Sequence, residues 1–178
     1  KPYWDSIPGR HLLNIGIDEA MSQFEALFER ACKICMRSDV PYGVLLSGGI
    51  DSSMVLRSCL KINRDVDAFS VAMSEIDFDE SSKAKEIASC LGVHRHNLFE
   101  MTAKTVSQKF QNYQNTLDEP NGDPGFVNML FLSQSCSKDI TVAISGDGGD
   151  ELFAGYTTFA GLKFLPIFKK IPKFAQSY

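Results

Sequence analysis

Two glycine-rich segments in distant parts of the sequence carry the residue types best suited to chemistry. Residues 45–53 read LLSGGIDSS, and residues 144–152 read ISGDGGDEL. Each begins with apolar residues typical of a strand and continues with glycine and aspartate. Glycine lets backbone N–H groups approach phosphate oxygens, and the start of a following helix favours negative charge. Together the two segments predict a polyphosphate site.

The first segment combines phosphate donors with a carboxylate. A carboxylate beside polyphosphate is repelled unless a divalent cation lies between them, so Asp51 is a predicted Mg²⁺ ligand. The segment lacks the lysine of the common phosphate loop GxxxxGK[ST], and a loop without it suits cleavage between the alpha and beta phosphates. An ordinary glycine turn would explain the two glycines but not the flanking serines and aspartate. The predicted phosphate ligands are Ser47, Gly48, Gly49, Ser52 and Ser53.

The second segment places three carboxylates beside three glycines. Carboxylates this close repel one another, so we expect a bound cation or protonation. Asp150 is the second predicted Mg²⁺ ligand. Glu151 has an alternative role as a helix residue in the first turn, where the dipole favours an acid. The residues concerned are Gly146, Asp147, Gly148, Gly149, Asp150 and Glu151.

Strands and helices alternate along the chain and would position both segments. Hydrophobic spacing predicts helices at 17–34, 52–60, 80–91, 104–115, 126–137 and from 151 onward, and strands at 42–46, 67–72, 94–99 and 140–144. This alternation predicts an α/β fold with a mostly parallel sheet and helices on both faces. Ligands collect at the carboxyl ends of such strands, where both segments begin, so the two can face one ligand.

Length and composition limit the functional classes. With 178 residues and 44% hydrophobic residues, the chain can form one domain, divided here into a helical lead-in (1–40) and an α/β core (41–178). A net charge of -4 argues against a nucleic-acid partner and favours small-molecule substrates. No signal segment or bilayer-length apolar run is present, which predicts a cytoplasmic protein without a membrane partner. The chain starts at Lys1, and we expect it to be part of a longer protein.

The five cysteines are interpreted as reduced thiols. Cys32 and Cys35 form a CxxC, but within a helix that spacing puts two small residues on one face. No strand-to-helix turn precedes them, as a redox motif would require. A redox or metal role is the alternative.

Four fragments, in this order, resemble the synthetase domain of glutamine-hydrolysing asparagine synthetases. They are SDVPYGVLLSGGIDSS, FSV, DEPNGDPG and ISGDGGDELFAGY. The resemblance covers nearly the whole chain and implies an adenine nucleotide alpha hydrolase-like fold of the N-type ATP pyrophosphatase (PP-loop) family. It also implies ATP and Mg²⁺ as cofactors. A glutaminase domain and a carboxyl-terminal helical part would lie outside this chain, so the stretch alone should have little activity; a homodimer is a further expectation.

The implied reaction makes asparagine from aspartate. The aspartate side chain attacks the alpha phosphorus of ATP, giving beta-aspartyl-AMP and pyrophosphate, and ammonia released from glutamine then displaces AMP. Asp51 and Asp147 are the implied catalytic residues, although many relatives carry glutamate at the position of Asp147. The implied ATP ligands are Leu46, Ser47, Gly48, Gly49, Asp51, Ser52, Ser53, Val71, Ser145 and Gly146, with Asp51 and Asp150 on magnesium.

Two other functions remain open. A related adenylating amidotransferase or lactam-forming enzyme would act on another carboxylate. A non-catalytic nucleotide-binding relative would keep only the fold, although the intact carboxylates of both segments argue against it.

Two further sets of residues give weaker signals. His94 and His96 alternate along a predicted strand and so share one face, for which exposure to solvent is favoured over a ligand pair. The loop around residues 118–123 has two interpretations: it lines a substrate pocket, or it is a simple connection. Its acidic residues are Asp118, Glu119 and Asp123.

Overall fold

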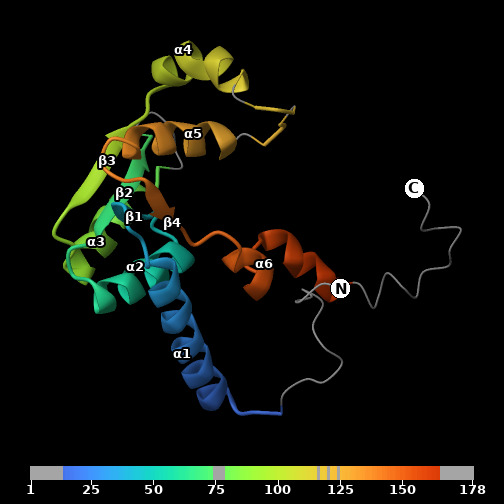
Figure 1. Cartoon of the computed structure of the whole chain (residues 1–178). Helices are drawn as coiled ribbons and strands as arrows, with labels where there is room; N and C mark the ends of the chain where they lie inside the picture. The colour runs from blue at the N-terminus through green and yellow to red at the C-terminus, as the bar shows by residue number, and fades with distance from the viewer. Residues whose placement is uncertain (1–13, 74–78, 116, 120, 124, 165–178) are drawn as a thin grey trace, which may run out of the picture.

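The computed structural model describes residues 14–73, 79–115, 117–119, 121–123 and 125–164 (Figure 1). None of the helices within these ranges is long and apolar enough to cross a membrane. The elements are α1 (Ile17–Cys35), β1 (Tyr42–Leu45), α2 (Ile50–Ile62), β2 (Asp67–Ala72), α3 (Ser81–Leu91), β3 (His96–Glu100), α4 (Ala103–Gln114), α5 (Gly125–Cys136), β4 (Val142–Ile144), α6 (Gly149–Phe153) and a 3₁₀ helix, η1 (Thr157–Phe164).

The four strands form one parallel sheet in the order β3-β2-β1-β4. The chain moves outward from β1 through β2 to β3 and then returns to place β4 on the other side of β1. The strand order therefore reverses between β1 and β4. Parallel sheets open a ligand crevice at such a reversal, beyond the carboxyl ends of the strands.

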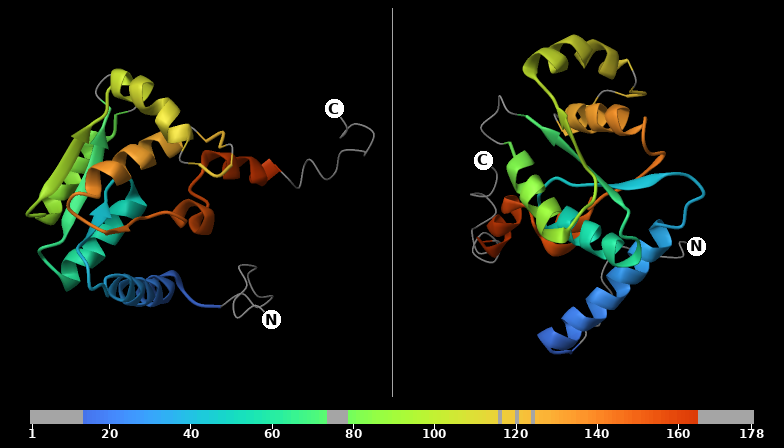
Figure 2. Two further views of the ribbon diagram at one scale, coloured as in Figure 1. Left: turned by 45° about the horizontal axis from the view of Figure 1, so that its top comes forward. Right: turned by 90° about the vertical axis from the view of Figure 1, so that its left-hand side faces the viewer.

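Helices cover both faces of this sheet, as predicted (Figures 1 and 2). On one face α2 and α3 contact the strands, and α1 packs against α2. On the other face α5 contacts β2, and α4 packs against α5. Side chains alternate accordingly: Val44 and Ala68 belong to the core under α2 and α3, whereas Phe69 belongs to a second core with Cys136 of α5.

Four elements begin two residues away from the predicted position, and one of them is the fourth strand, which begins at Val142 rather than Ile140. The second helix begins at Ile50 rather than Ser52, so Asp51 lies in its first turn. The third strand begins at His96, and the helix expected from Glu151 begins at Gly149. That last helix is short because the chain turns into the left-handed region at Ala154 (φ 56°).

The cysteine thiols divide by burial, and all five are free. Cys32, Cys59 and Cys136 are buried, whereas Cys35 and Cys90 are exposed. Burial raises the pKa of Cys59 to about 12 and that of Cys136 to about 11. The thiolate is the reactive form, so the buried thiols are inert at neutral pH.

We expect iodoacetamide to alkylate Cys35 and Cys90 of the native protein at pH 8 while leaving Cys32, Cys59 and Cys136 unmodified. The thiolate fraction falls tenfold for each unit by which the pKa exceeds the pH. Peptide mass spectrometry reads the outcome, and alkylation in urea serves as the control because all five thiols should then react. Rapid native labelling of Cys59 would show that this core is wrongly placed.

Candidate functional site

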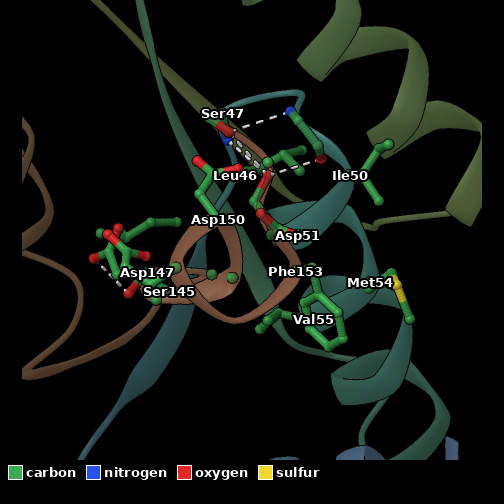
Figure 3. A pocket seen from close by; sticks show the side chains of 18 of the residues that line it. Leu46, Ser47, Ile50, Asp51, Met54, Val55, Ser145, Asp147, Asp150 and Phe153 are labelled. Carbon is green, nitrogen blue, oxygen red and sulfur yellow. Dashed lines mark hydrogen bonds between the residues drawn. The ribbon is translucent and has the colours of Figure 1, made fainter. Parts of the chain in front are cut away.

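The two glycine-rich loops line one cavity of about 1150 Å³, at the carboxyl ends of β1 and β4 (Figure 3). Its position is the crevice expected from the reversal of strand order. The first loop contributes Leu46, Ser47, Gly49, Asp51 and Ser52, and the second contributes Ser145, Gly146, Asp147, Gly148, Gly149, Asp150 and Glu151.

The loops pack so closely that a Cβ atom at either of two glycines of the second loop would overlap with the first turn of α2. A Cβ atom on Gly146 would lie 2.7 Å from the backbone nitrogen of Ser52 and 2.9 Å from the carbonyl carbon of Asp51. A Cβ atom on Gly149 would lie 2.5 Å from Cγ of Asp51. The second loop therefore rests on the first turn of α2, which explains the spacing of its glycines.

Each loop also turns through one left-handed glycine. Gly48 has φ +89° and Gly148 has φ +92°. Residues with a Cβ atom rarely adopt this backbone conformation. These turns direct the chain from the strand end into the following helix.

Hydroxyl groups close the first loop on itself. The buried Ser52 Oγ donates to the carbonyl of Gly49 (3.2 Å) and accepts from the backbone nitrogen of Ser47 (3.2 Å). Ser47 Oγ lies 3.0 Å from Ser52 Oγ and accepts from the backbone nitrogen of Gly49 (3.2 Å). Ser53 Oγ donates to the same Gly49 carbonyl (2.5 Å). These hydroxyls hold the shape of the loop, and a bound phosphate would have to compete with their internal bonds.

Two carboxylates from different loops face the cavity. Asp51 lies in the first turn of α2 and Asp150 in the first turn of α6 (Figure 3). No three His, Cys, Asp or Glu side chains in the described ranges group closely enough to hold a metal ion by themselves. Magnesium commonly takes only one or two carboxylates together with substrate phosphates, so this pair of oxygen donors fits Mg²⁺.

The other acidic side chains of the second loop have partners within it. Asp147 is exposed, and its Oδ2 accepts a hydrogen bond from Ser145 Oγ (2.8 Å). Glu151 lines the cavity from the first turn of α6 and accepts from the hydroxyl of Tyr156 (2.6 Å). This bond raises the pKa of Tyr156 to about 12 and lowers the pKa of Glu151. Glu151 is thus a first-turn acid, as in the alternative that the sequence left open, and it also lines the cavity.

An apolar wall completes the cavity on the side of β2 and α5. Val71, predicted from the sequence, lies in this wall. Three residues of α5 that were not predicted from the sequence also line it: Asn128, Met129 and Leu132. A signal was present, because Asn128 is a polar residue within the apolar run GFVNMLFL.

Two predicted phosphate ligands lie elsewhere. Gly48 and Ser53 line a separate, shallower groove between α2 and α3 rather than the main cavity. The backbone of Gly48 faces α3, because a Cβ atom there would lie 3.0 Å from the backbone nitrogen of Ala84. Any contact of these two residues with phosphate remains a prediction.

The acidic residues of the 118–125 segment have no place in the cavity wall formed by described residues. Asp118, Glu119 and Asp123 are exposed. Asp123 has a structural role, since its Oδ1 accepts from the backbone nitrogen of Gly125 (2.8 Å) at the start of α5.

The expected exposure of the two histidines to solvent is confirmed for His94 but was wrong for His96. His94 precedes β3 and is exposed, with Nδ1 3.3 Å from Oδ1 of Asp65. His96 opens the strand, is half-buried and lies 2.8 Å from the Ser70 hydroxyl. The strand begins two residues later than predicted, so the alternation of side chains along a strand does not extend to His94.

Comparison with known proteins identifies the family. The sequence model described as asparagine synthase matches residues 23–177. The chain belongs to the asparagine synthase family. It is 36% identical over 155 residues to the glutamine-hydrolyzing asparagine synthetase 1 of Bacillus subtilis (strain 168), covering 83% of this chain and 23% of that protein. It is 33% identical over 178 residues to amidase chyE of Penicillium rubens, covering 89% and 26%. The chain thus spans about a quarter of the length of these relatives.

A solved structure supports the fold assigned to this member of the asparagine synthase family. The glutamine-dependent NAD+ synthetase from Acinetobacter baumannii superposes with a TM-score of 0.56 at 21% identity, covering 82% of this chain and 29% of that one. The parallel four-stranded sheet with helices on both faces is the predicted adenine nucleotide alpha hydrolase-like fold.

Proposed function

We propose that the full-length protein is an ATP-dependent ligase that converts aspartate to asparagine, with ammonia supplied from glutamine by a domain outside this chain. Membership of the asparagine synthase family supports this class of reaction. The observation that carries the proposal is the contact of the two glycine-rich loops around one cavity that both Asp51 and Asp150 line. Such a cavity suits a polyphosphate that is bound by one loop on each side.

The proposed reaction has two steps. A carboxylate oxygen of aspartate bonds to the alpha phosphorus of ATP while the bond from that phosphorus to the alpha-beta bridging oxygen breaks, which releases pyrophosphate. Ammonia then bonds to the acyl carbon of beta-aspartyl-AMP, a proton is lost, and AMP leaves. Backbone N–H groups of the loops would hold the departing pyrophosphate. Asp51 and Asp150 would hold Mg²⁺, which neutralises phosphate charge when bound.

The adenosine half of ATP would occupy the wall nearest β1 and β2. Leu46, Val71, Ser145 and Gly146 all line the cavity. Two of them are apolar and lie at neighbouring strand ends, which suits the face of a purine. Assignment of the triphosphate to the glycine loops then leaves the region of Asp147 and Glu151 for the carboxylate substrate.

A second candidate keeps the adenylation step but amidates a different carboxylate. The similarity to amidase chyE favours it as the alternative. The test is to incubate the full-length protein with MgATP, aspartate and either glutamine or ammonia, and to follow pyrophosphate, AMP and asparagine. Asparagine formed together with AMP supports the first proposal. Pyrophosphate formed only with another carboxylate supports the second, and none with any carboxylate contradicts both.

We expect Asp147→Ala to lower product formation by about 100-fold, the usual effect of losing an acid or base that handles protons. Asp147→Glu should stay within about threefold of the parent rate, because the carboxylate is kept and the exposed site has room for one methylene. Initial rates at saturating MgATP measure both. Asp139→Ala is the matched control, because it removes an exposed carboxylate that does not line the cavity. Equal losses in the two Asp147 variants would contradict a role for the carboxylate.

A further inference from the structure

A buried hydroxyl group beneath the first loop connects three elements. Ser70 of β2 is only 1% exposed. Its Oγ lies 2.5 Å from the carbonyl oxygen of Leu46 and 2.8 Å from Nε2 of His96 in β3. Leu46 is among the described residues that line the main cavity, whereas Ser70 and His96 are not. The side-chain contact of Ser70 therefore reaches the cavity through the backbone of Leu46.

The direction of these hydrogen bonds follows from counting hydrogen atoms. A carbonyl oxygen can only accept, so the single hydroxyl hydrogen of Ser70 points to Leu46. The Ser70 oxygen must then accept from His96, which requires a proton on Nε2. Burial, aided by the charge of Lys85, lowers the pKa of His96 and favours the neutral ring. Neutral His96 in this arrangement is the Nε2–H tautomer.

We propose that Ser70 and His96 are positioning residues for the nucleotide site, acting through the carbonyl of Leu46. Leu46 follows the end of β1 directly and is the first residue of the glycine-rich loop. Its backbone nitrogen donates to the carbonyl of Phe69 (2.8 Å), and its carbonyl accepts from Ser70. Both polar groups of its backbone are therefore fixed by β2, which sets the direction in which the chain enters Ser47. The inference rests on the proposed function because it takes ATP as the ligand.

The chemistry of the side chains gives a set of matched variants for the full-length protein. Ser70→Ala removes the link, and His96→Leu removes the donor without adding a charge. His96→Gln carries an amide nitrogen at about the reach of Nε2, whereas the amide nitrogen of His96→Asn falls short. Ser58→Ala is the control, because Ser58 is also buried (3% exposed) but lies in α2 outside the cavity wall.

Calorimetric titration with MgATP tests the role. We expect the Kd to rise about tenfold in Ser70→Ala, His96→Leu and His96→Asn, in line with the loss of one buried hydrogen bond. His96→Gln and Ser58→Ala should stay within about twofold of the parent. Urea unfolding of each variant confirms that the titrated samples are folded. An unchanged Kd in Ser70→Ala, or an equal loss in His96→Gln, would overturn the proposal.

Histidine ¹⁵N spectra of the full-length protein at pH 8 test the hydrogen-bond direction separately. The His96 signals, assigned through His96→Asn, should report a protonated Nε2, and a protonated Nδ1 would overturn the proposal. A protein that binds MgATP with the predicted pattern of Kd values but releases no pyrophosphate would refute the proposed function while supporting the positioning role. A protein that binds no MgATP would refute both.

Discussion

Asp51→Asn should abolish pyrophosphate release while leaving the fold intact. Asp51 lies between the two loops, in contact with Gly149, and is a proposed ligand of Mg²⁺. The stabilisation that a metal gives to developing phosphate charge is several kcal/mol, which corresponds to a loss of about a thousandfold in rate. Stability should fall by less than about 1 kcal/mol, because the change removes only a first-turn charge at the start of α2. Pyrophosphate release under MgATP and aspartate measures the effect.

The matched control for this variant is Asp118→Asn. It makes the same chemical change at an exposed carboxylate that does not belong to the described cavity wall. Its rate and unfolding midpoint should equal those of the parent. Near-normal turnover of Asp51→Asn would remove Asp51 from the magnesium site.

Gly146→Ala should separate the two loops. The added Cβ would lie 2.7 Å and 2.9 Å from backbone atoms of Ser52 and Asp51, and no rotation of a side chain relieves that overlap. Overpacking of this kind costs about 1–3 kcal/mol unless the backbone moves apart. A displacement of about 1 Å at a reacting centre lowers rates by about 100-fold, so we expect at least that loss of pyrophosphate release. The affinity for MgATP should fall with it.

Gly16→Ala is the matched control, because a Cβ atom on Gly16 would meet nothing within 4 Å. We expect parent activity from it and a change in unfolding free energy below about 1 kcal/mol. Full activity of Gly146→Ala, with an unchanged unfolding midpoint, would show that the loops are not in contact.

The fold was predictable from the sequence because its periodic elements are strong signals. The buried runs at 42–46 and 67–72 and the helices between them led directly to a parallel sheet, and the ordered fragments pointed to the family that the comparison confirms. The convergence of the two loops also followed, since both begin at carboxyl ends of strands. The strand order β3-β2-β1-β4, which places β1 beside β4, came only from the structure.

Details that depend on tertiary contacts could not be predicted. The inward position of His96 depends on where β3 begins and on the neighbouring hydroxyl of Ser70. The use of Ser52 and Ser53 to close the loop depends on the path of the Gly49 carbonyl. Local sequence shows a serine or a histidine but not which partner lies across the sheet.

The most direct measurement is a crystal structure of the full-length protein with Mg²⁺ and an ATP analogue that cannot be cleaved between the alpha and beta phosphates. We predict that the phosphates lie between the 45–53 and 144–152 segments and that the metal ion is bound by both Asp51 and Asp150. Phosphates held by one loop alone, or a metal ion bound by neither carboxylate, would contradict the account.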